Sequence, residues 1–297
     1  MSPPRIFDRA IYAKRRARAE RTHDGSFLVA DAAQTLFERV SAVNRTFRRA
    51  IDIGSRRQSF VRLRPLAERW TRVVPDAAQN SSEPDVVTAD EECLPFAEAS
   101  FDLVVSILSL HAANDLPGVL FQIRRLLVED GLFVGAILGG ATLQELRRAF
   151  AVGETQMLGG MSPRVAPFAD VRDVGGLLQR AGFALPVADL ERLTVRYEHF
   201  LTLAGDLRAL GETNALMERS RKPLQRSTLA AALHAYAEHD SEPDGKLRAT
   251  FDVIYLTGWA ASNPQPTRRN SESRPNEGLD TALARRLALD QGRFCAI

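Results

Sequence analysis

The chain has 297 residues, of which 45% are hydrophobic and 26% are charged, so it can bury a full core as one large domain or two modest ones. Its 39 basic and 37 acidic residues give a net charge of +2, which excludes a whole-protein field that draws it to nucleic acid or membrane. Two distant cysteines, Cys93 and Cys295, exclude a secreted disulfide scaffold and favour a reducing compartment. No apolar run approaches the roughly 20 residues of a membrane span, and we expect no signal peptide.

The first element in chain order is a basic segment, residues 1–28, which we expect to be helical. Between Arg9 and Arg21 it carries several arginines and one lysine against the single acid Glu20. One interpretation is a helix that contacts an acidic partner, the surface of an anionic membrane or, in a eukaryote, an import receptor. The other is an exposed helix face, which we favour because charge runs are most often exposed to solvent.

From residue 29 onward, helical periods alternate with short apolar runs. The predicted elements are a helix over 29–43, strands over 50–53, 70–74, 86–89 and 101–108, a helix over 116–127 and a strand over 132–138. The run 101–108 is continuously apolar, as expected of a central parallel strand that is covered on both faces. Strands that alternate with amphipathic helices imply right-handed βαβ units and a parallel sheet.

The second half contains more helix. The predicted elements are helices over 142–152, 170–181, 200–210 and 223–239, and strands over 190–197 and 250–259. We expect residues 29–260 to form one domain, with a core sheet over about 48–140 and a helical insertion and the last strands over 141–260. Residues 261–297 are polar and are predicted to be a flexible tail, with a linker over 261–278 and a short helix over 279–289.

Polar residues that directly follow the apolar runs form the candidate site, because ligands of open α/β sheets bind beyond the carboxyl ends of the strands. These residues are Asp52 and Gly54 after the first strand, Asp76 after the second, Asp90, Glu91 and Leu94 after the third, and His111, Asn114 and Asp115 after the fourth. An acid after the second strand suits a ribose diol, and the third group suits a base with an exocyclic amine. Each residue also has a structural interpretation: a lone histidine is more often structural than catalytic.

The turn after the first strand, Ile51-Asp52-Ile53-Gly54-Ser55-Arg56-Arg57, has the form that opens an S-adenosylmethionine-binding domain. In that form further glycines let the backbone approach the ligand. Here Arg56, Arg57 and Gln58 stand in their places.

Several longer segments carry a family resemblance. They include Asp90-Glu91-Glu92-Cys93-Leu94-Pro95-Phe96, Gly139-Gly140-Ala141-Thr142-Leu143 and Gly211-Glu212-Thr213-Asn214. These segments resemble class I S-adenosylmethionine-dependent methyltransferases and, more narrowly, the family of mitochondrial complex I assembly factor 5, the arginine hydroxylase, with its bacterial relatives. The resemblance extends over roughly residues 7–259, and a more distant one is to the malonyl-carrier-protein methyltransferase of biotin synthesis.

The resemblance implies a Rossmann-like, doubly wound, mostly parallel sheet with a terminal antiparallel strand, for which 250–259 is the candidate. It also implies S-adenosylmethionine as cofactor, held by Asp52, Gly54, Asp76, Asp90, Glu91 and Leu94. The chain departs from the family at the missing glycines and at Ala112, where the family tends to have an aromatic residue. Both departures indicate weakened or lost cofactor binding. We find no spaced histidine and carboxylate set for iron and expect no metal.

Three functions are therefore compared. The first is an S-adenosylmethionine-dependent methyltransferase-like enzyme that acts on a protein or acyl substrate, with an acyl carrier protein as one partner. The second is a respiratory complex I assembly factor that grips a complex I subunit, either hydroxylating an arginine or acting as a non-catalytic scaffold. The third, a nucleic-acid methyltransferase, is weakest because the charge balance offers no phosphate track, so no nucleic-acid partner is expected. The expected location is the bacterial cytoplasm, or the mitochondrial matrix in a eukaryote, with peripheral membrane contact possible only through the basic N-terminus.

Overall fold

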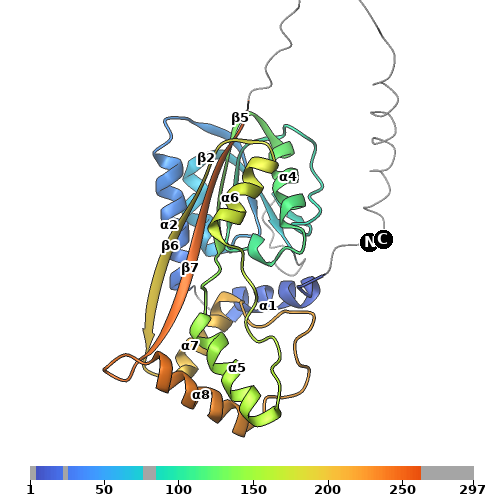
Figure 1. Cartoon of the computed structure of the whole chain (residues 1–297). Coiled ribbons are helices and arrows are strands. Elements are labelled where there is room, and N and C mark those ends of the chain that lie inside the picture. Colours follow the sequence, from blue (N-terminus) through green and yellow to red (C-terminus); the bar gives the residue numbers. More distant parts are fainter. Residues whose placement is uncertain (1–4, 23–25, 76–84, 262–297) are drawn as a thin grey trace, which may run out of the picture. The chain divides into compact units, whose positions relative to one another are not determined.

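The computed structural model describes residues 5–22, 26–75 and 85–261 (Figure 1). Its helices are α1 (Arg9–Thr22), α2 (Phe27–Ser41), α3 (Arg57–Leu63), α4 (Leu116–Leu126), α5 (Gln144–Leu158), α6 (Val171–Arg180), α7 (Phe200–Leu210) and α8 (Arg226–Asp240). Its strands are β1 (Phe47–Ile53), β2 (Ala67–Val74), β3 (Val86–Thr88), β4 (Phe101–Ile107), β5 (Leu127–Leu138), β6 (Phe183–Tyr197) and β7 (Leu247–Ala260). The predictions for Asp76, the rest of the linker after residue 261, and the helix 279–289 lie outside the described residues.

The strands form one mixed sheet in the order β3-β2-β1-β4-β5-β7-β6. The strands β1 to β5 are parallel, and β7 pairs antiparallel with both β5 and β6. The predicted Rossmann-like, mostly parallel sheet is confirmed, and residues 250–259 lie in its antiparallel strand. This strand is inside the sheet, and β6 forms the edge. The strand order reverses between β1 and β4, which is where ligands of such sheets bind.

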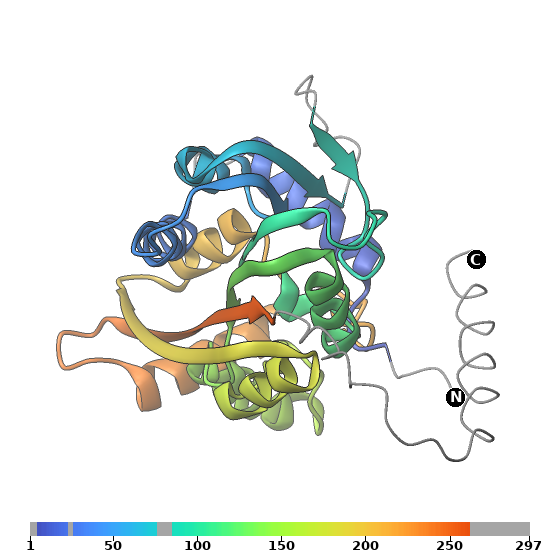
Figure 2. The same cartoon turned by 90° about the horizontal axis from the view of Figure 1, so that it is seen from above.

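Alternate side chains of the central strands enter two separate cores. Leu103 and Val105 of β4 face the core that α2 and α3 cover, whereas Val104 faces the core under α4 and α6. Figure 2 shows α2 and α4 on opposite sides of the sheet. Coverage on both faces explains why these strands read as continuous apolar runs.

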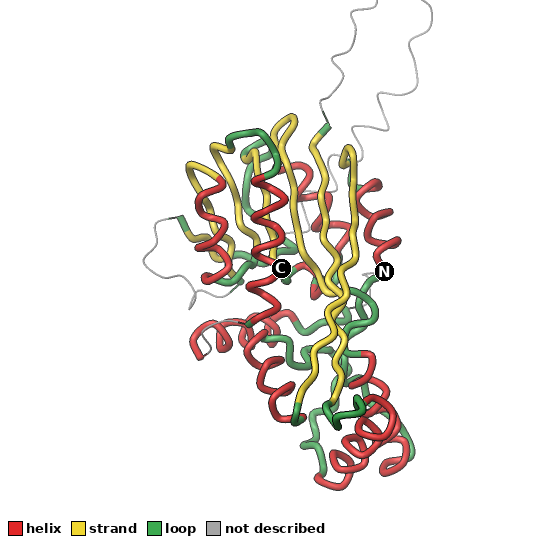
Figure 3. The backbone as a smooth tube through the Cα atoms, turned by 90° about the vertical axis from the view of Figure 1, so that its left-hand side faces the viewer, coloured by secondary structure: helices red, strands yellow, loops and turns green. Residues whose placement is uncertain are grey.

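The helices α5, α7 and α8 lie beyond the sheet, and the long ribbon of β6 and β7 runs out to them (Figures 1 and 3). The two strands stay paired from Phe183 opposite Ala260 to Tyr197 opposite Leu247. The helix α1 lies between the sheet and this helical group and contacts α7. A cavity lies where these parts meet, and it is lined by His111 after β4, Leu138 at the end of β5 and Leu207 of α7.

Several elements differ in extent from the predictions: β1, β2 and β7, for example, each begin three residues before the predicted start. The helix α3 begins at Arg57, directly after the turn, and was not predicted. The strand β5 begins at Leu127, because Glu129-Asp130-Gly131 forms an irregularity with Asp130 at φ +56° instead of ending the helix in a loop. The strand β6 begins at Phe183, seven residues before the predicted start: Pro186 argues against a strand but is tolerated at a sheet edge, and the register shifts there.

Candidate functional site

Gly54 directly follows β1, at the point where the strand order reverses. Its φ is +70°, and its N–H donates to the carbonyl of Val73 at 3.0 Å. A Cβ on this residue would lie 2.2 Å from the Ser109 Oγ and 2.6 Å from the Glu91 Oε1. Because both the dihedral angle and the contacts exclude a side chain, only glycine fits this position without rearrangement.

The ends of β1 and β4 are tied together by two serines. The Ser106 hydroxyl donates to the Ile53 carbonyl at 2.8 Å, and the Ser55 Oγ accepts from the Ile107 N–H at 3.0 Å. The strand ends are therefore held at a fixed spacing, and the carbonyls of Gly54 and Leu108 face a common neighbour, the Arg16 guanidinium of α1. Arg16 donates to both, at 2.6 Å for Gly54.

Asp52 lies in β1, two residues before Gly54. It is fully buried, and its Oδ2 lies 3.3 Å from the Nε of Arg72 on β2. Burial raises the pKa of this carboxyl although Arg72 acts in the opposite direction. Arg72 also donates to the carbonyl of Ser55 at 3.1 Å. The ion pair of Asp52 and Arg72 therefore stabilises the turn that follows β1.

The acids after β3 meet α1. The Arg9 guanidinium lies 3.0 Å from the Oδ1 of Asp90 and forms an ion pair with Glu91. Glu91 is almost fully buried and accepts from the Ser109 hydroxyl at 2.6 Å, whereas the Asp90 side chain is 42% exposed. Leu94 packs against the core under α4 and α6. Of these three residues, Asp90 is therefore the acid that presents an accessible carboxylate.

The three candidates after β4 separate. His111 lines a cavity, and its Nε2 lies 3.1 Å from the Oε2 of Glu212, which is an ion-pair distance. Asn114 instead anchors the chain before α1, because its Oδ1 accepts from the N–H groups of Ile6 and Phe7, each at 2.8 Å. Asp115 caps α4 and accepts from the N–H of Gly118 at 2.9 Å.

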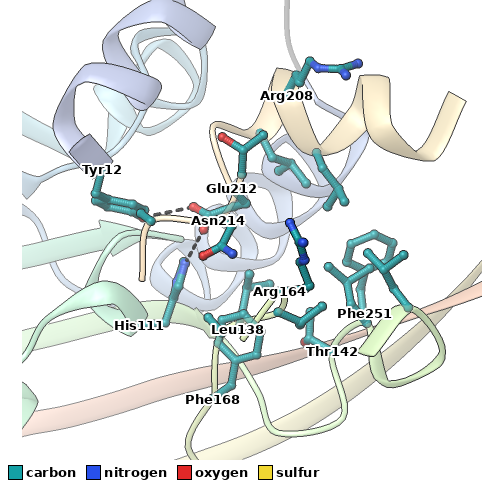
Figure 4. A pocket seen from close by; sticks show the side chains of 18 of the residues that line it. Tyr12, His111, Leu138, Thr142, Arg164, Phe168, Arg208, Glu212, Asn214 and Phe251 are labelled. Atoms are coloured by element: carbon teal, nitrogen blue, oxygen red, sulfur yellow. Dashed lines mark hydrogen bonds and ion pairs between the residues drawn. The ribbon is translucent and has the colours of Figure 1, made fainter. Parts of the chain in front are cut away.

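Glu212 is the central acid of the cavity and was not predicted as a site residue (Figure 4). The Tyr12 hydroxyl donates to its Oε1 at 2.9 Å, and the Nη1 of Arg16 lies 3.6 Å from the same atom. Burial acts to raise the pKa of Glu212, but His111 and Arg16 outweigh it and hold the pKa below its ordinary value. Glu212 is therefore ionised at neutral pH.

The cavity has a volume of about 190 Å³ and lies between the ends of β4 and β5 and the helical group. Its walls are mostly apolar and include Leu138, Phe168 and Phe251. The Arg164 side chain points into the cavity in Figure 4. Its Nε donates to the Oε1 of Glu154 at 2.7 Å, which fixes the guanidinium in place. Arg164 lies between α5 and α6, and Glu212 lies between α7 and α8. Neither residue directly follows a parallel strand, so the strand pattern of the sequence does not predict that they line this cavity.

Two searches concern only the described part of the chain. No group of three or more His, Cys, Asp or Glu side chains in residues 5–22, 26–75 and 85–261 is arranged to hold a metal ion. None of the helices in the same ranges has the length and apolar content that crossing a membrane requires.

Comparison with known proteins gives matches at three levels. A family model described as a methyltransferase domain matches residues 66–135. The mitochondrial arginine-hydroxylase NDUFAF5 of Danio rerio is 37% identical over 279 residues, 90% of this chain and 87% of that protein. The malonyl-[acyl-carrier protein] O-methyltransferase of Halorhodospira halophila is 35% identical over 272 residues, 87% of this chain and 90% of that protein. The structure of YcgJ from Bacillus subtilis superposes with a TM-score of 0.53 at 13% identity, over 78% of this chain and 99% of that one.

The sheet topology, the family model and the 35% identical methyltransferase together identify a class I S-adenosylmethionine-dependent methyltransferase-like protein. The structural match supports the fold alone. Within this class, the chain belongs to the family that contains the arginine hydroxylase NDUFAF5, and it is related to the malonyl-[acyl-carrier protein] O-methyltransferases. The predicted resemblance is confirmed at both levels.

Proposed function

We propose that the chain binds S-adenosylmethionine at the ends of β1 and β4 and modifies a group that a partner protein inserts into the adjacent cavity. One observation carries the proposal: Arg16 bonds the Gly54 carbonyl and also lies 3.6 Å from Glu212 in the cavity wall. A ligand at Gly54 and a substrate in the cavity are thus separated by the width of one guanidinium.

The residues at this edge fit the groups of S-adenosylmethionine. Gly54 leaves the backbone of the turn without a side chain, and the carbonyls of Gly54 and Leu108 are two convergent acceptors. An ammonium group needs such acceptors, so the amino-acid end of the cofactor would displace Arg16 from them. The carboxylate of Asp90 suits a hydroxyl or amine donor of the nucleoside, with Leu94 as an apolar neighbour. The proposed set of cofactor residues also keeps Asp52, Glu91 and Asp76.

When bound, S-adenosylmethionine supplies a sulfonium methyl group to an attacking nucleophile. The protein's contribution is chiefly to position that nucleophile in the cavity. His111 is placed to accept a proton from the nucleophile, and the Glu212 carboxylate stabilises the imidazolium that results. The apolar walls of the cavity exclude water from the reacting groups.

The size of the cavity favours a substrate group carried by another protein. A volume of about 190 Å³ holds a side chain or a short acyl group but no folded element. The proposed partner is accordingly an acyl carrier protein or a subunit of respiratory complex I. The proposed compartment is the bacterial cytoplasm, or the mitochondrial matrix if the source is eukaryotic.

A second candidate function is assembly of respiratory complex I, either by hydroxylating an arginine of a subunit or as a scaffold. Two observations favour it: the relatives that are named arginine hydroxylases, and the occupation of both strand-end carbonyls by Arg16. In this version the missing glycines mark a cofactor site that is weakened or lost.

Transfer of a radiolabelled methyl group separates the two candidates. Purified protein is incubated with methyl-labelled S-adenosylmethionine and either a malonyl-loaded acyl carrier protein or a preparation of complex I subunits, with His111→Ala as the control. Label on the partner that disappears in the variant supports methyl transfer. If no label is transferred, and a subunit arginine gains one oxygen atom only in cells that carry the gene, the second function replaces the first.

A further inference from the structure

Arg56 is a buried cation whose hydrogen-bonding groups the protein does not fully satisfy. Its exposed fraction is 5%, and its Nε and Nη2 have no hydrogen-bond partner. It stands two residues after Gly54, where the family pattern has a glycine. A buried guanidinium with two unpartnered nitrogens needs an explanation, because burying polar groups without hydrogen bonds is costly.

A second arginine is a direct neighbour of Arg56, and two carboxylates, Glu20 and Glu212, act on it with the opposite charge. A Cβ on Gly211 would lie 3.2 Å from the Arg56 Nη2 and 3.1 Å from the Cγ of Arg16, so the two arginine side chains are neighbours. Burial and the charge of Arg16 lower the pKa of Arg56 to about 10. The guanidinium nevertheless stays protonated at neutral pH.

The nearby carboxylates are already committed to other donors. Glu20 accepts from the backbone N–H of Arg57 at 2.7 Å. Glu212 accepts from Tyr12 and pairs with His111. Neither of them forms a hydrogen bond with the Nε or Nη2 of Arg56. Two donors of Arg56 are therefore left without an acceptor at the end of β1, beside the two carbonyls that Arg16 occupies.

We propose that Arg56 binds the carboxylate of the amino-acid end of S-adenosylmethionine and so replaces, with a side chain, the backbone contacts that the missing glycines would supply. This inference rests on the proposed function. It assigns separate partners to the two charges of the amino-acid end: the carbonyls of Gly54 and Leu108 to the ammonium group, and Arg56 to the carboxylate. A bidentate guanidinium and carboxylate pair is the geometry that arginine favours.

The test compares two ligands that differ only in this end. S-adenosylhomocysteine carries the amino-acid end, and 5′-methylthioadenosine lacks it. Calorimetric Kd values are measured for both ligands with the wild type, Arg56→Met and the matched control Arg57→Met. Because a hydrogen bond to a charged group contributes about 1.5–3 kcal/mol, we expect Arg56→Met to lose S-adenosylhomocysteine affinity by about tenfold to hundredfold while its affinity for 5′-methylthioadenosine is unchanged. The control should retain the wild-type ratio.

Thermal unfolding without ligand gives an independent readout. Methionine retains the unbranched stem of the arginine and removes its buried charge, so Arg56→Met should unfold at the same or a higher temperature than the wild type. A lower unfolding temperature would assign Arg56 a structural role and overturn the inference. Equal losses for both ligands, or no loss, would overturn it as well while leaving cofactor binding intact. If neither ligand binds the wild type, the proposed function fails and the inference fails with it.

Discussion

Replacing Gly54 with alanine tests the close packing at the end of β1. The left-handed φ of +70° costs an L-residue about 1–2 kcal/mol. The new Cβ would also lie 2.2 Å from the Ser109 Oγ and 2.6 Å from the Glu91 Oε1, so both side chains must move. Overpacking of a buried site typically costs about 1–3 kcal/mol more, so we expect the free energy of unfolding to fall by about 2–5 kcal/mol.

The matched control is Gly182→Ala, at the glycine that follows α6. Gly182 has a φ of +85°, but a Cβ there would have no atom within 4 Å. This variant should lose only the backbone contribution, about 1–2 kcal/mol. Urea unfolding of both variants measures the difference. Equal losses would refute the claim that Ser109 and Glu91 close the space beside Gly54.

Three further predictions concern the cavity and the strand ends. Glu212→Gln removes an acid whose pKa in the folded protein lies below its usual 4.5. The ionised Glu212 therefore stabilises the folded protein by about 1–3 kcal/mol near neutral pH. This stabilisation is present above pH 4.5 and is lost as the pH falls below it. Urea unfolding from pH 7 to pH 3 should show the wild type and this variant converging, and a constant gap would contradict the assignment. His111→Ala should lower methyl transfer by about 10²- to 10⁴-fold with unchanged affinity for S-adenosylhomocysteine. Asp115→Ala should unfold about 1 kcal/mol more easily because α4 loses its cap, and its transfer rate should match the wild type. If His111→Ala and Asp115→Ala lost methyl transfer equally, the assignment of a catalytic role to His111 and a capping role to Asp115 would be refuted.

The alternation of helices and strands predicts most of the fold because it reflects how each segment is covered. Residues 101–108 are apolar throughout since both faces of β4 are buried, and this is visible without a structure. Residues 183–189 do not show the same signal. These residues belong to the edge strand β6, which pairs with β7 on one side only. Proline and an exposed leucine are tolerated in such a strand, so Leu185 and Pro186 do not prevent it from forming.

The candidate site is predictable where it follows from strand order. Gly54, Asp90 and His111 each follow a parallel strand, so their common edge can be inferred from the sequence. Tyr12, Arg16 and Glu212 come from outside the sheet, and only tertiary packing brings them to it. The family motif Gly211-Glu212-Thr213-Asn214 was the available signal for Glu212, but it did not indicate what the acid contacts.

Arg56 shows the difference between a departure from a motif and its consequence. From the sequence, an arginine in place of a glycine indicates a damaged cofactor site. The structure adds that this arginine is buried and that two of its nitrogens have no hydrogen-bond partner. This is expected of a residue that binds an anionic ligand. The same substitution therefore supports a different and testable role.

The central claim is that the edge formed by β1 and β4 binds S-adenosylmethionine, and mass spectrometry of the small molecules released from freshly purified, denatured protein tests it most directly. The account predicts S-adenosylmethionine or S-adenosylhomocysteine in the released fraction of the wild type, with the amount reduced in Arg56→Met. Absence of both from the wild type, together with no calorimetric binding when either is added at millimolar concentration, would contradict it.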